Sequence, residues 1–370
     1  MDREIIDIIY FVSFIFVYLS LLVLSKVKIR RSMLCLSMGI ILFVLLGFRT
    51  LDQGLNDTRE TYLGMYEMIH NMNWGQMYSS QFAENTSMLF VTWMKLINIL
   101  SFNNFRVFIV ISAFLFVAAF EYLIYRCCQD VLIGNLFFIS FLYPYGFYLL
   151  RQCYALIFCA LALQYSSRQY YRKGAVMGVI AGLIHSISFV FLAALLLYYF
   201  CCIRFRFKAQ LIQRLCLLMA VLMALIPSVF KTLLILLPQN SKYMNLLLAN
   251  VYQDGELWLA PLLVNIAFYC FFCWKYSQQK THFVKIHMTN SVMAIVGIAA
   301  SAIIQDMYRL ALFFYASNMV LLSNAFVIVD KQASHKFRMR RDIFFYLIFI
   351  AIGLYLFIIV LPNNNIISIY

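Results

Sequence analysis

The stretch Pro144-Tyr-Gly-Phe-Tyr-Leu-Leu-Arg-Gln-Cys-Tyr-Ala155 places one guanidinium, that of Arg151, in an apolar region of the chain. A second apolar run, Gly178-Val-Ile-Ala-Gly-Leu-Ile-His-Ser-Ile-Ser188, contains His185. Ionisable groups at membrane depth are costly, so they normally face the interior of a helix bundle or a wet cavity. We therefore treat Arg151 and His185 as candidate site residues of a membrane protein.

The composition of the chain predicts an all-α, polytopic membrane protein. Of the 370 residues, 64% are hydrophobic and 12% are charged, whereas soluble domains carry about 25% charged residues. Apolar blocks long enough to span a bilayer, about 20 residues each, recur along the whole sequence. We predict one multispan domain over residues 1–370, built from about 10–13 transmembrane or half-membrane helices.

The excess of basic residues sets the predicted orientation. The net charge is +14, and Lys and Arg accumulate in the cytoplasmic loops of membrane proteins. We assign the basic connectors to the cytoplasm and expect no nucleic-acid partner, because no foldable soluble domain carries a basic stripe. These connectors lie at residues 26–31, 168–173, 204–208, 275–285 and 331–341. The predicted spans are 5–24, 32–48, 105–125, 130–149, 151–166, 174–202, 210–226, 257–274, 289–305, 310–329 and 343–361. Periplasmic loops are then expected at about 49–104 and 227–256.

Two segments do not fit a simple alternation of spans and loops. Segment 174–202 joins two basic connectors but is too short for two full spans, so we predict two half-length helices that meet near His185, as a re-entrant hairpin or a pair of short tilted helices. Broken geometry at membrane depth occurs only where it is buried in protein or lines a cavity. Segment 87–101 is short, amphipathic and contains Lys95, so we predict a helix in the outer interface, with a full crossing as the alternative.

The predicted topology brings several charged side chains to the outer ends of the spans. Guanidinium groups bind phosphate oxygens in bidentate fashion and stay charged in a poor dielectric, so several of them together suit a pyrophosphate. A carboxylate or an imidazole beside them can take a proton from an attacking hydroxyl. The arginines are Arg49, Arg59, Arg151 and Arg309, and the candidate bases are Asp57, Glu84 and His185.

The carboxylates of the outer loops give no sign of a metal site. They are scattered, and the sequence contains neither a D-x-D nor an H-x-x-x-H motif. We therefore expect chemistry without a metal ion or a cofactor.

Four of these candidates also have a purely structural interpretation. Arg49 can be an anchor whose charge reaches the membrane interface, and His185 can be a hydrogen-bonded packing residue. Asp57 and Glu84 can be solvated acids of the outer loop.

Aromatic residues surround Arg151 in the sequence. Tyr148 and Tyr154 fit an interfacial aromatic belt, in which amphipathic rings lie at the level of the lipid headgroups. The same rings could stack on sugars, so both remain candidates for sugar binding.

The order of these residues resembles the EpsG-like branch of the Wzy-type bacterial polysaccharide polymerases. In that family, a Gly-Phe/Leu-Arg at the end of a span precedes an Asp-Thr with a nearby Tyr, an acid, an Arg-Gln-x-x-Ala, a His and a late Arg with aromatics. The matching residues, within 40–320, are Gly47-Phe48-Arg49, Asp57-Thr58 with Tyr62, Glu84, Arg151-Gln152 with Ala155, His185-Ser186, and Arg309 with Phe313-Phe314-Tyr315.

The resemblance implies a GT-C-like glycosyltransferase of the bacterial inner membrane whose active site faces the periplasm. It would transfer a growing glycan from undecaprenyl pyrophosphate to the terminal sugar of a new lipid-linked repeat unit of an O-antigen, capsule or exopolysaccharide. The implied pyrophosphate ligands are Arg49, Arg151, Arg309 and, more weakly, Arg59. The implied base is Asp57, Glu84 or His185, and Tyr62 would contact sugar. The implied partners are the lipid-linked glycan, membrane lipids, and a chain-length regulator and a flippase of the same pathway.

Two other classes of protein use similar groups. An O-antigen ligase moves finished glycan and differs in its acceptor. A transporter or flippase of lipid-linked glycan could hold pyrophosphate with the same arginines, but it favours charges at several depths and internal repeats. The predicted topology puts nearly all special charges on one side, which favours chemistry at the membrane surface.

Overall fold

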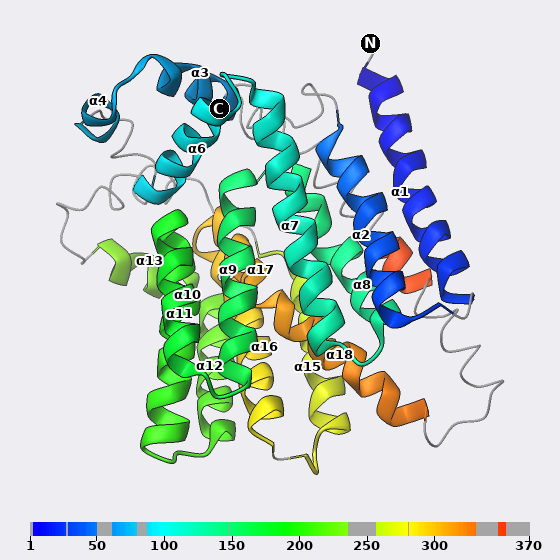
Figure 1. The fold of residues 1–370 in the computed structure, drawn as a ribbon. Coiled ribbons are helices and arrows are strands. Elements are labelled where there is room, and N and C mark those ends of the chain that lie inside the picture. Colours follow the sequence, from blue (N-terminus) through cyan, green and yellow to red (C-terminus); the bar gives the residue numbers. More distant parts are fainter. Residues whose placement is uncertain are drawn as a thin grey trace. The chain divides into compact units, whose positions relative to one another are not determined.

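The structure, a computed structural model, describes residues 3–26, 29–49, 61–79, 87–147, 149–235, 257–279, 281–330 and 347–352. Every regular element in these ranges is a helix, which confirms the predicted all-α fold (Figure 1). The chain forms two compact units. Unit 1 comprises Met1–Leu161, Met177–Phe189 and Phe326–Tyr370, and unit 2 comprises Ala162–Val176 and Val190–Ala325. A single domain over residues 1–370 stays a prediction.

Four helices that lie side by side form the core of unit 1 (Figure 1). They are α1 (Arg3–Lys26), α2 (Arg31–Gly47), α7 (Phe105–Cys127) and α8 (Val131–Phe141). Aromatic rings fill the contact between α7 and α8, where Phe120 stacks on Phe138 with ring centroids 4.8 Å apart. A 3₁₀ segment, η3 (Tyr143–Phe147), follows α8 and is buried throughout.

An arginine at the start of α2 binds the free carbonyl groups at the end of α7. The Nη2 of Arg31 donates to the carbonyl oxygen of Ile124 at 3.1 Å, and also to those of Tyr125 and Cys128. The last carbonyl groups of a helix lack donors within the helix and carry partial negative charge. Arg31 therefore stabilises the end of α7 while joining it to α2.

Unit 1 also contains a smaller group of helices, α3 (Gly64–Asn71), α4 (Trp74–Ser79) and α6 (Met88–Leu100), of which α6 contacts α7 and α3 packs on α6 (Figure 1). The α6 helix is the one predicted for 87–101, and its place in the membrane interface stays a prediction. A charge on an interfacial helix would be exposed, whereas Lys95 is buried, with 7% of the residue exposed. Its Nζ donates to three carbonyl oxygens at the end of α3, those of Ile69 at 2.8 Å, His70 at 3.2 Å and Met72 at 2.9 Å.

Polar side chains complete the contact between α3 and α6. The Nδ2 of Asn98 donates to the carbonyl oxygen of Tyr66 at 3.1 Å, and its Oδ1 lies 3.0 Å from the Nδ1 of His70. The hydroxyl groups of Tyr66 and Ser101 are 2.6 Å apart. Burial raises the pKa of the Tyr66 hydroxyl, so this group stays neutral and can keep its hydrogen bond over the physiological pH range.

Lys95→Met is expected to destabilise α3, because a side chain of similar length replaces the only charge that binds its three end carbonyls in the described residues. Hydrogen bonds to a charged group are worth about 2 kcal/mol, so the amides of α3 should exchange hydrogen roughly 30-fold faster. Hydrogen exchange of the detergent-solubilised protein measures this effect. Lys173→Met, at an exposed position of unit 2, is the control. If the α3 amides of Lys95→Met exchange hydrogen as slowly as those of the unmodified protein, Lys95 does not stabilise the end of α3.

The helix that follows η3 is α9 (Leu150–Ser167), and it is followed by α10 (Tyr171–Ile184). His185 then interrupts the helix with an extended backbone, φ −146° and ψ 106°. The chain continues through η4 (Ser186–Ser188), α11 (Phe189–Tyr198) and a π-helical turn, η5 (Tyr199–Arg204). The break predicted near His185 is therefore confirmed. We predicted that the helices on both sides of this break have half the length of a span. This prediction is wrong for the second helical segment, because Ser186–Arg204 has 19 residues and is long and apolar enough to cross a membrane.

Unit 2 is built around α16 (His282–Ala299), which packs against α12 (Ala209–Leu225), α15 (Leu259–Lys275) and α17 (Arg309–Leu312). The span predicted at 289–305 begins earlier, at His282, because Thr281 caps the helix. The Oγ1 of Thr281 accepts from the backbone nitrogen of Val284 at 3.3 Å. Lys285, predicted in a connector, therefore lies in the first turn of α16. The other elements are α13 (Pro227–Ile235), η6 (Ala300–Ala302), η7 (Gln305–Tyr308) and α18 (Tyr315–Asp330).

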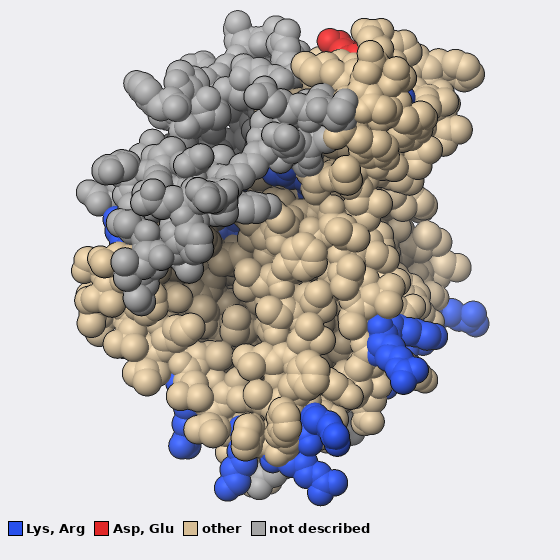
Figure 2. Space-filling view, turned by 90° about the vertical axis from the view of Figure 1, so that its left-hand side faces the viewer, with Lys and Arg blue, Asp and Glu red and all other residues tan. Residues whose placement is uncertain are grey.

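The apolar surfaces of these helices fit a lipid environment. In the described residues, Phe105–Cys127, Ser186–Arg204 and His282–Ala302 are long and apolar enough to cross a membrane. The exposed side of α2 is a stripe of Met33, Leu36, Ile40 and Val44, at the spacing of one helix face. On the face shown in Figure 2, most of the described surface carries no Lys, Arg, Asp or Glu. Such surfaces are too apolar for water, and the chain is a multi-pass membrane protein.

Candidate functional site

Arg49 lies two residues beyond the end of α2 and ties that end to η3 in unit 1. Its guanidinium is buried, with 4% of the residue exposed, and its Nη1 donates to the carbonyl oxygens of Leu46 and Gly146, each at 3.2 Å. It also lies over the ring of Phe147, 5.4 Å from the centroid, at a distance typical of a cation–π contact. Arg49 therefore holds the segment that leads into α9.

A glycine allows the close approach of η3 to α2 and α7. A Cβ on Gly146 would lie 3.0 Å from a methyl group of Leu46 and 3.2 Å from the ring of Phe116. The hydroxyl of Tyr143 donates to the carbonyl oxygen of Leu42 at 2.8 Å. These contacts fix the position at which α9 begins, and thus the position of Arg151.

Arg151 is the second residue of α9 and is half-buried. Its backbone nitrogen donates to the hydroxyl of Tyr62 at 3.4 Å, which brings these two predicted site residues together. Within the part of the chain that the structure describes, the Arg151 guanidinium has no hydrogen-bond or ion-pair partner. Arg49 already binds backbone carbonyl groups, so Arg151 is the better placed of the two to bind an anion from outside the chain.

His185 lies at the end of α10, where α6 begins. The Oγ of Ser87, the N-cap residue of α6, donates to the carbonyl oxygen of Ile184, next to His185. The same helix reaches the Arg151 neighbourhood, because the ring of Phe90 packs edge-on against Tyr62 at 5.9 Å. The α6 helix thus connects the surroundings of His185 to those of Arg151.

The ends of α2, α9 and α10 that carry Arg49, Arg151 and His185 lie at one end of unit 1 (Figure 1). The start of α9 adds partial positive charge there, since the first amide groups of a helix point along its axis without partners in the helix. Arg49 and Arg106 add full positive charges, because Arg106 donates to the carbonyl oxygens of Phe48, at 2.8 Å, and Arg49. This end of unit 1 therefore favours an anion.

Tyr154 lies deeper in unit 1 than a sugar-binding residue at a surface would. Its hydroxyl and that of Ser112 are 2.7 Å apart, and its ring packs among those of Phe90, Trp93 and Phe108. Its contacts are those of a packing residue, and its role in sugar binding stays a prediction.

Arg309 is the first residue of α17 in unit 2, with its guanidinium 5.9 Å from the ring centroid of Tyr308. Its assignment to the same site as Arg151 stays a prediction from the resemblance. The predicted residues Asp57, Arg59, Glu84 and Tyr148 lie outside the described residues.

Two residues of this neighbourhood were not identified from the sequence. Arg106 supports the end of α2 that carries Arg49, and Ser87 contacts the end of α10. A serine directly before an apolar helical run is a typical start signal, so Ser87 could have been found as an N-cap. Nothing in the local sequence indicates that Arg106 binds the end of α2, because that contact depends on packing between distant segments.

The fold and this cluster define a class: an all-helical, multi-pass membrane protein with guanidinium groups gathered at one end of a helical unit. Within that class, the chain belongs to the EpsG family, whose model matches residues 32–369. The resemblance to EpsG-like proteins is thereby confirmed, and membership indicates a role in exopolysaccharide biosynthesis. No curated protein and no solved structure matches the chain.

Proposed function

We propose that this protein is a polysaccharide polymerase that joins undecaprenyl-pyrophosphate-linked repeat units at the periplasmic face of the inner membrane. The observation that carries the proposal is the position of Arg151, a half-buried residue at the start of α9 whose backbone nitrogen binds the hydroxyl of Tyr62, at the same end of unit 1 as Arg49 and His185. Membership of the EpsG family supports the same class of substrate.

The reaction transfers a glycan from one lipid carrier to another. The hydroxyl oxygen of the acceptor sugar attacks the anomeric carbon of the donor glycan, and the bond from that carbon to the pyrophosphate oxygen breaks. The bonding electrons leave with undecaprenyl pyrophosphate, and the hydroxyl proton passes to a base. Negative charge therefore develops on the leaving pyrophosphate, where fixed positive groups lower the barrier most effectively.

The proposal gives each candidate residue a distinct role. Arg151 binds the pyrophosphate in bidentate fashion and stabilises it as the leaving group. Arg49 contributes positive charge and positions η3 and the start of α9, and Tyr62 contacts a sugar. His185, Asp57 or Glu84 accepts the proton, and Arg309 and Arg59 are further candidate phosphate ligands.

Deleting the gene in its natural host tests the proposal against the ligase and flippase alternatives. Loss of a polymerase leaves single repeat units on the lipid carrier, exposed at the periplasmic face, and no long chains. Loss of a ligase leaves long chains on the lipid carrier. Loss of a flippase leaves single units at the cytoplasmic face. Either of the last two patterns, restored by the intact gene, would overturn the proposal.

A further inference from the structure

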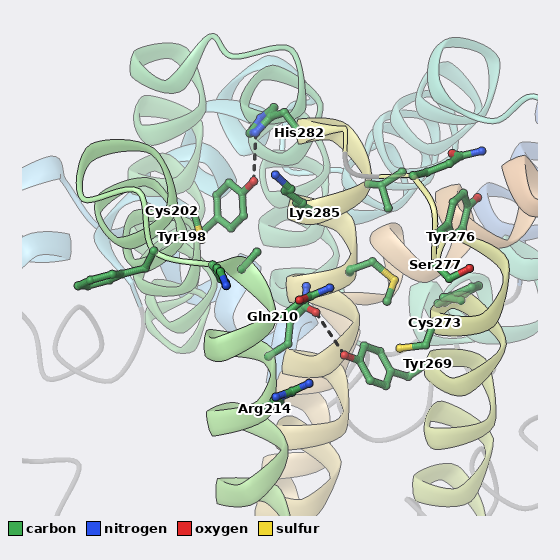
Figure 3. Close-up of a pocket in the computed structure, with 18 of the residues that line it drawn as sticks. Tyr198, Cys202, Gln210, Arg214, Tyr269, Cys273, Tyr276, Ser277, His282 and Lys285 are labelled. Carbon is green, nitrogen blue, oxygen red and sulfur yellow. Dashed lines mark hydrogen bonds between the residues drawn. The ribbon is translucent and has the colours of Figure 1, made fainter.

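Unit 2 contains a cavity of about 830 Å³ that the proposed reaction does not use. It is formed by the connector after η5, the first half of α12, the second half of α15 and the first turns of α16. Side chains from α12, α15 and α16 surround one space, among them Arg214, Tyr269 and Lys285 (Figure 3). The basic connectors beside it are those predicted to be cytoplasmic.

The charges that line this cavity have one sign. Its cations are Arg206, Lys208, Arg214 and Lys285. Among the lining residues that the structure describes, none is Asp or Glu. Four cations facing one space repel each other, so an anion in that space would relieve the repulsion and gain attraction from all four.

Hydrogen bonds between neighbouring helices hold the walls of the cavity in place. The Nδ1 of His282 lies 3.1 Å from the hydroxyl of Tyr198, and its Nε2 lies 3.0 Å from the carbonyl oxygen of Ser166. The hydroxyl of Tyr269 donates to the Oε1 of Gln213 at 3.3 Å. The uncharged part of the wall is therefore fixed, while the four cations are exposed at its surface.

The backbone at Arg206 adopts an unfavourable conformation. Its φ of 58° lies in the left-handed region, which side chains other than glycine rarely occupy. The next residue, Phe207, donates its backbone hydrogen to the carbonyl oxygen of Cys201 at 2.8 Å, and the π-helical turn η5 directly precedes the connector. Strained residues and π-helical turns both concentrate at functional sites.

Positive charge in cytoplasmic connectors is the general rule for membrane proteins. Basic residues in these connectors therefore do not by themselves indicate a binding site. The connectors predicted at 204–208 and 275–285 offer an internal comparison, because they also include Arg204 and Lys275, which do not line the cavity. The cavity also lies at the far end of α16 from Arg309. It is lined by His282 and Lys285, whereas α17 contacts Gly297 near the other end of this helix of 18 residues.

We propose that this cavity binds a phosphate-bearing ligand. Arginine binds phosphate oxygens in bidentate fashion, and lysine adds point charges. Basic pockets between transmembrane helices on the cytoplasmic side bind the headgroups of anionic lipids, and a soluble phosphate ester carries the same chemistry. The site is separate from the proposed polymerase reaction, and its test does not depend on that reaction.

The test measures ligand binding to the purified full-length protein by native mass spectrometry from detergent micelles. One arm titrates phosphatidylglycerol against phosphatidylcholine, and the other titrates glycerol 1-phosphate. Arg214→Gln/Lys285→Gln should weaken binding of the phosphate ligand roughly 10- to 30-fold. The matched control, Arg204→Gln/Lys275→Gln, removes the same charge outside the cavity and should bind like the unmodified protein.

Each outcome decides between the alternatives. Selective loss of phosphatidylglycerol binding supports the proposal with a lipid headgroup as ligand, and selective loss of glycerol 1-phosphate binding supports it with a soluble ligand. Equal weakening in both double variants, or binding of neither ligand, overturns it. If Arg214→Gln/Lys285→Gln does not fold, Arg206→Gln/Lys208→Gln in the exposed connector provides the same comparison.

Discussion

Arg151→Ala is expected to reduce chain elongation at least about 100-fold, the effect of removing one preorganised group that stabilises a developing negative charge. Arg151 is half-buried at the start of α9, and its guanidinium has no hydrogen-bond or ion-pair partner among the described residues. In the proposal, its loss removes a ligand for the pyrophosphate without breaking a side-chain hydrogen bond of the fold. Cells that carry the variant should contain single repeat units on the lipid carrier and no ladder of long chains on a glycan gel.

Two further variants test whether the effect depends on the guanidinium group and on its position in the chain. Arg151→Lys keeps the charge but loses the planar fork, so we expect an activity between those of the unmodified protein and Arg151→Ala. Arg126→Ala removes an exposed arginine from the last turn of α7, away from the start of α9, and should give a normal ladder. A normal ladder from stable Arg151→Ala protein would remove Arg151 from the site.

Gly297→Ala is expected to destabilise unit 2 strongly. A Cβ at this position would lie 2.6 Å from the backbone nitrogen of Ala311 and 3.1 Å from its Cα. These are backbone atoms, so α17, which begins with Arg309, must move. Overpacking of this kind costs about 3 kcal/mol, and we expect a fall in melting temperature on the order of 5–10 °C for the detergent-solubilised protein.

Gly64→Ala is the matched control for this substitution. Gly64 is the first residue of α3, and a Cβ there would meet nothing within 4 Å. Alanine favours the helix over glycine by about 1 kcal/mol, so the melting temperature should stay the same or rise slightly. A Gly297→Ala protein that melts like the unmodified one would mean that α16 and α17 do not pack as closely as described.

The sequence was most informative where membrane physics restricts the choices. Two basic connectors flank a segment that is too short for two spans, which was enough to predict the helix break at His185. The arginines at the ends of apolar runs led to the prediction that Arg49 and Arg151 share one site. In the structure the Arg49 side chain binds the carbonyl group of Gly146 in η3, which precedes α9, and the shared site stays a prediction.

Tertiary contacts account for what the sequence did not predict. The presence of Lys95 contributed to the prediction of an interfacial helix at 87–101, but the end of α3 supplies three carbonyl groups that make burial of its charge favourable. The predicted span began too late because His282 and Lys285 lower the hydropathy of the first turn of α16. The helix nonetheless starts there, because Thr281 caps it. The cavity of unit 2 depends on side chains from several helices, which no single stretch of sequence brings together.

The most direct test of the central claim uses the purified protein in proteoliposomes with synthetic undecaprenyl-pyrophosphate-linked repeat units. The proposal predicts a ladder of lengthening chains on the lipid carrier with release of undecaprenyl pyrophosphate, and loss of that ladder with Arg151→Ala. Folded protein that leaves only single repeat units, with its natural lipid-linked unit supplied, would contradict a polymerase.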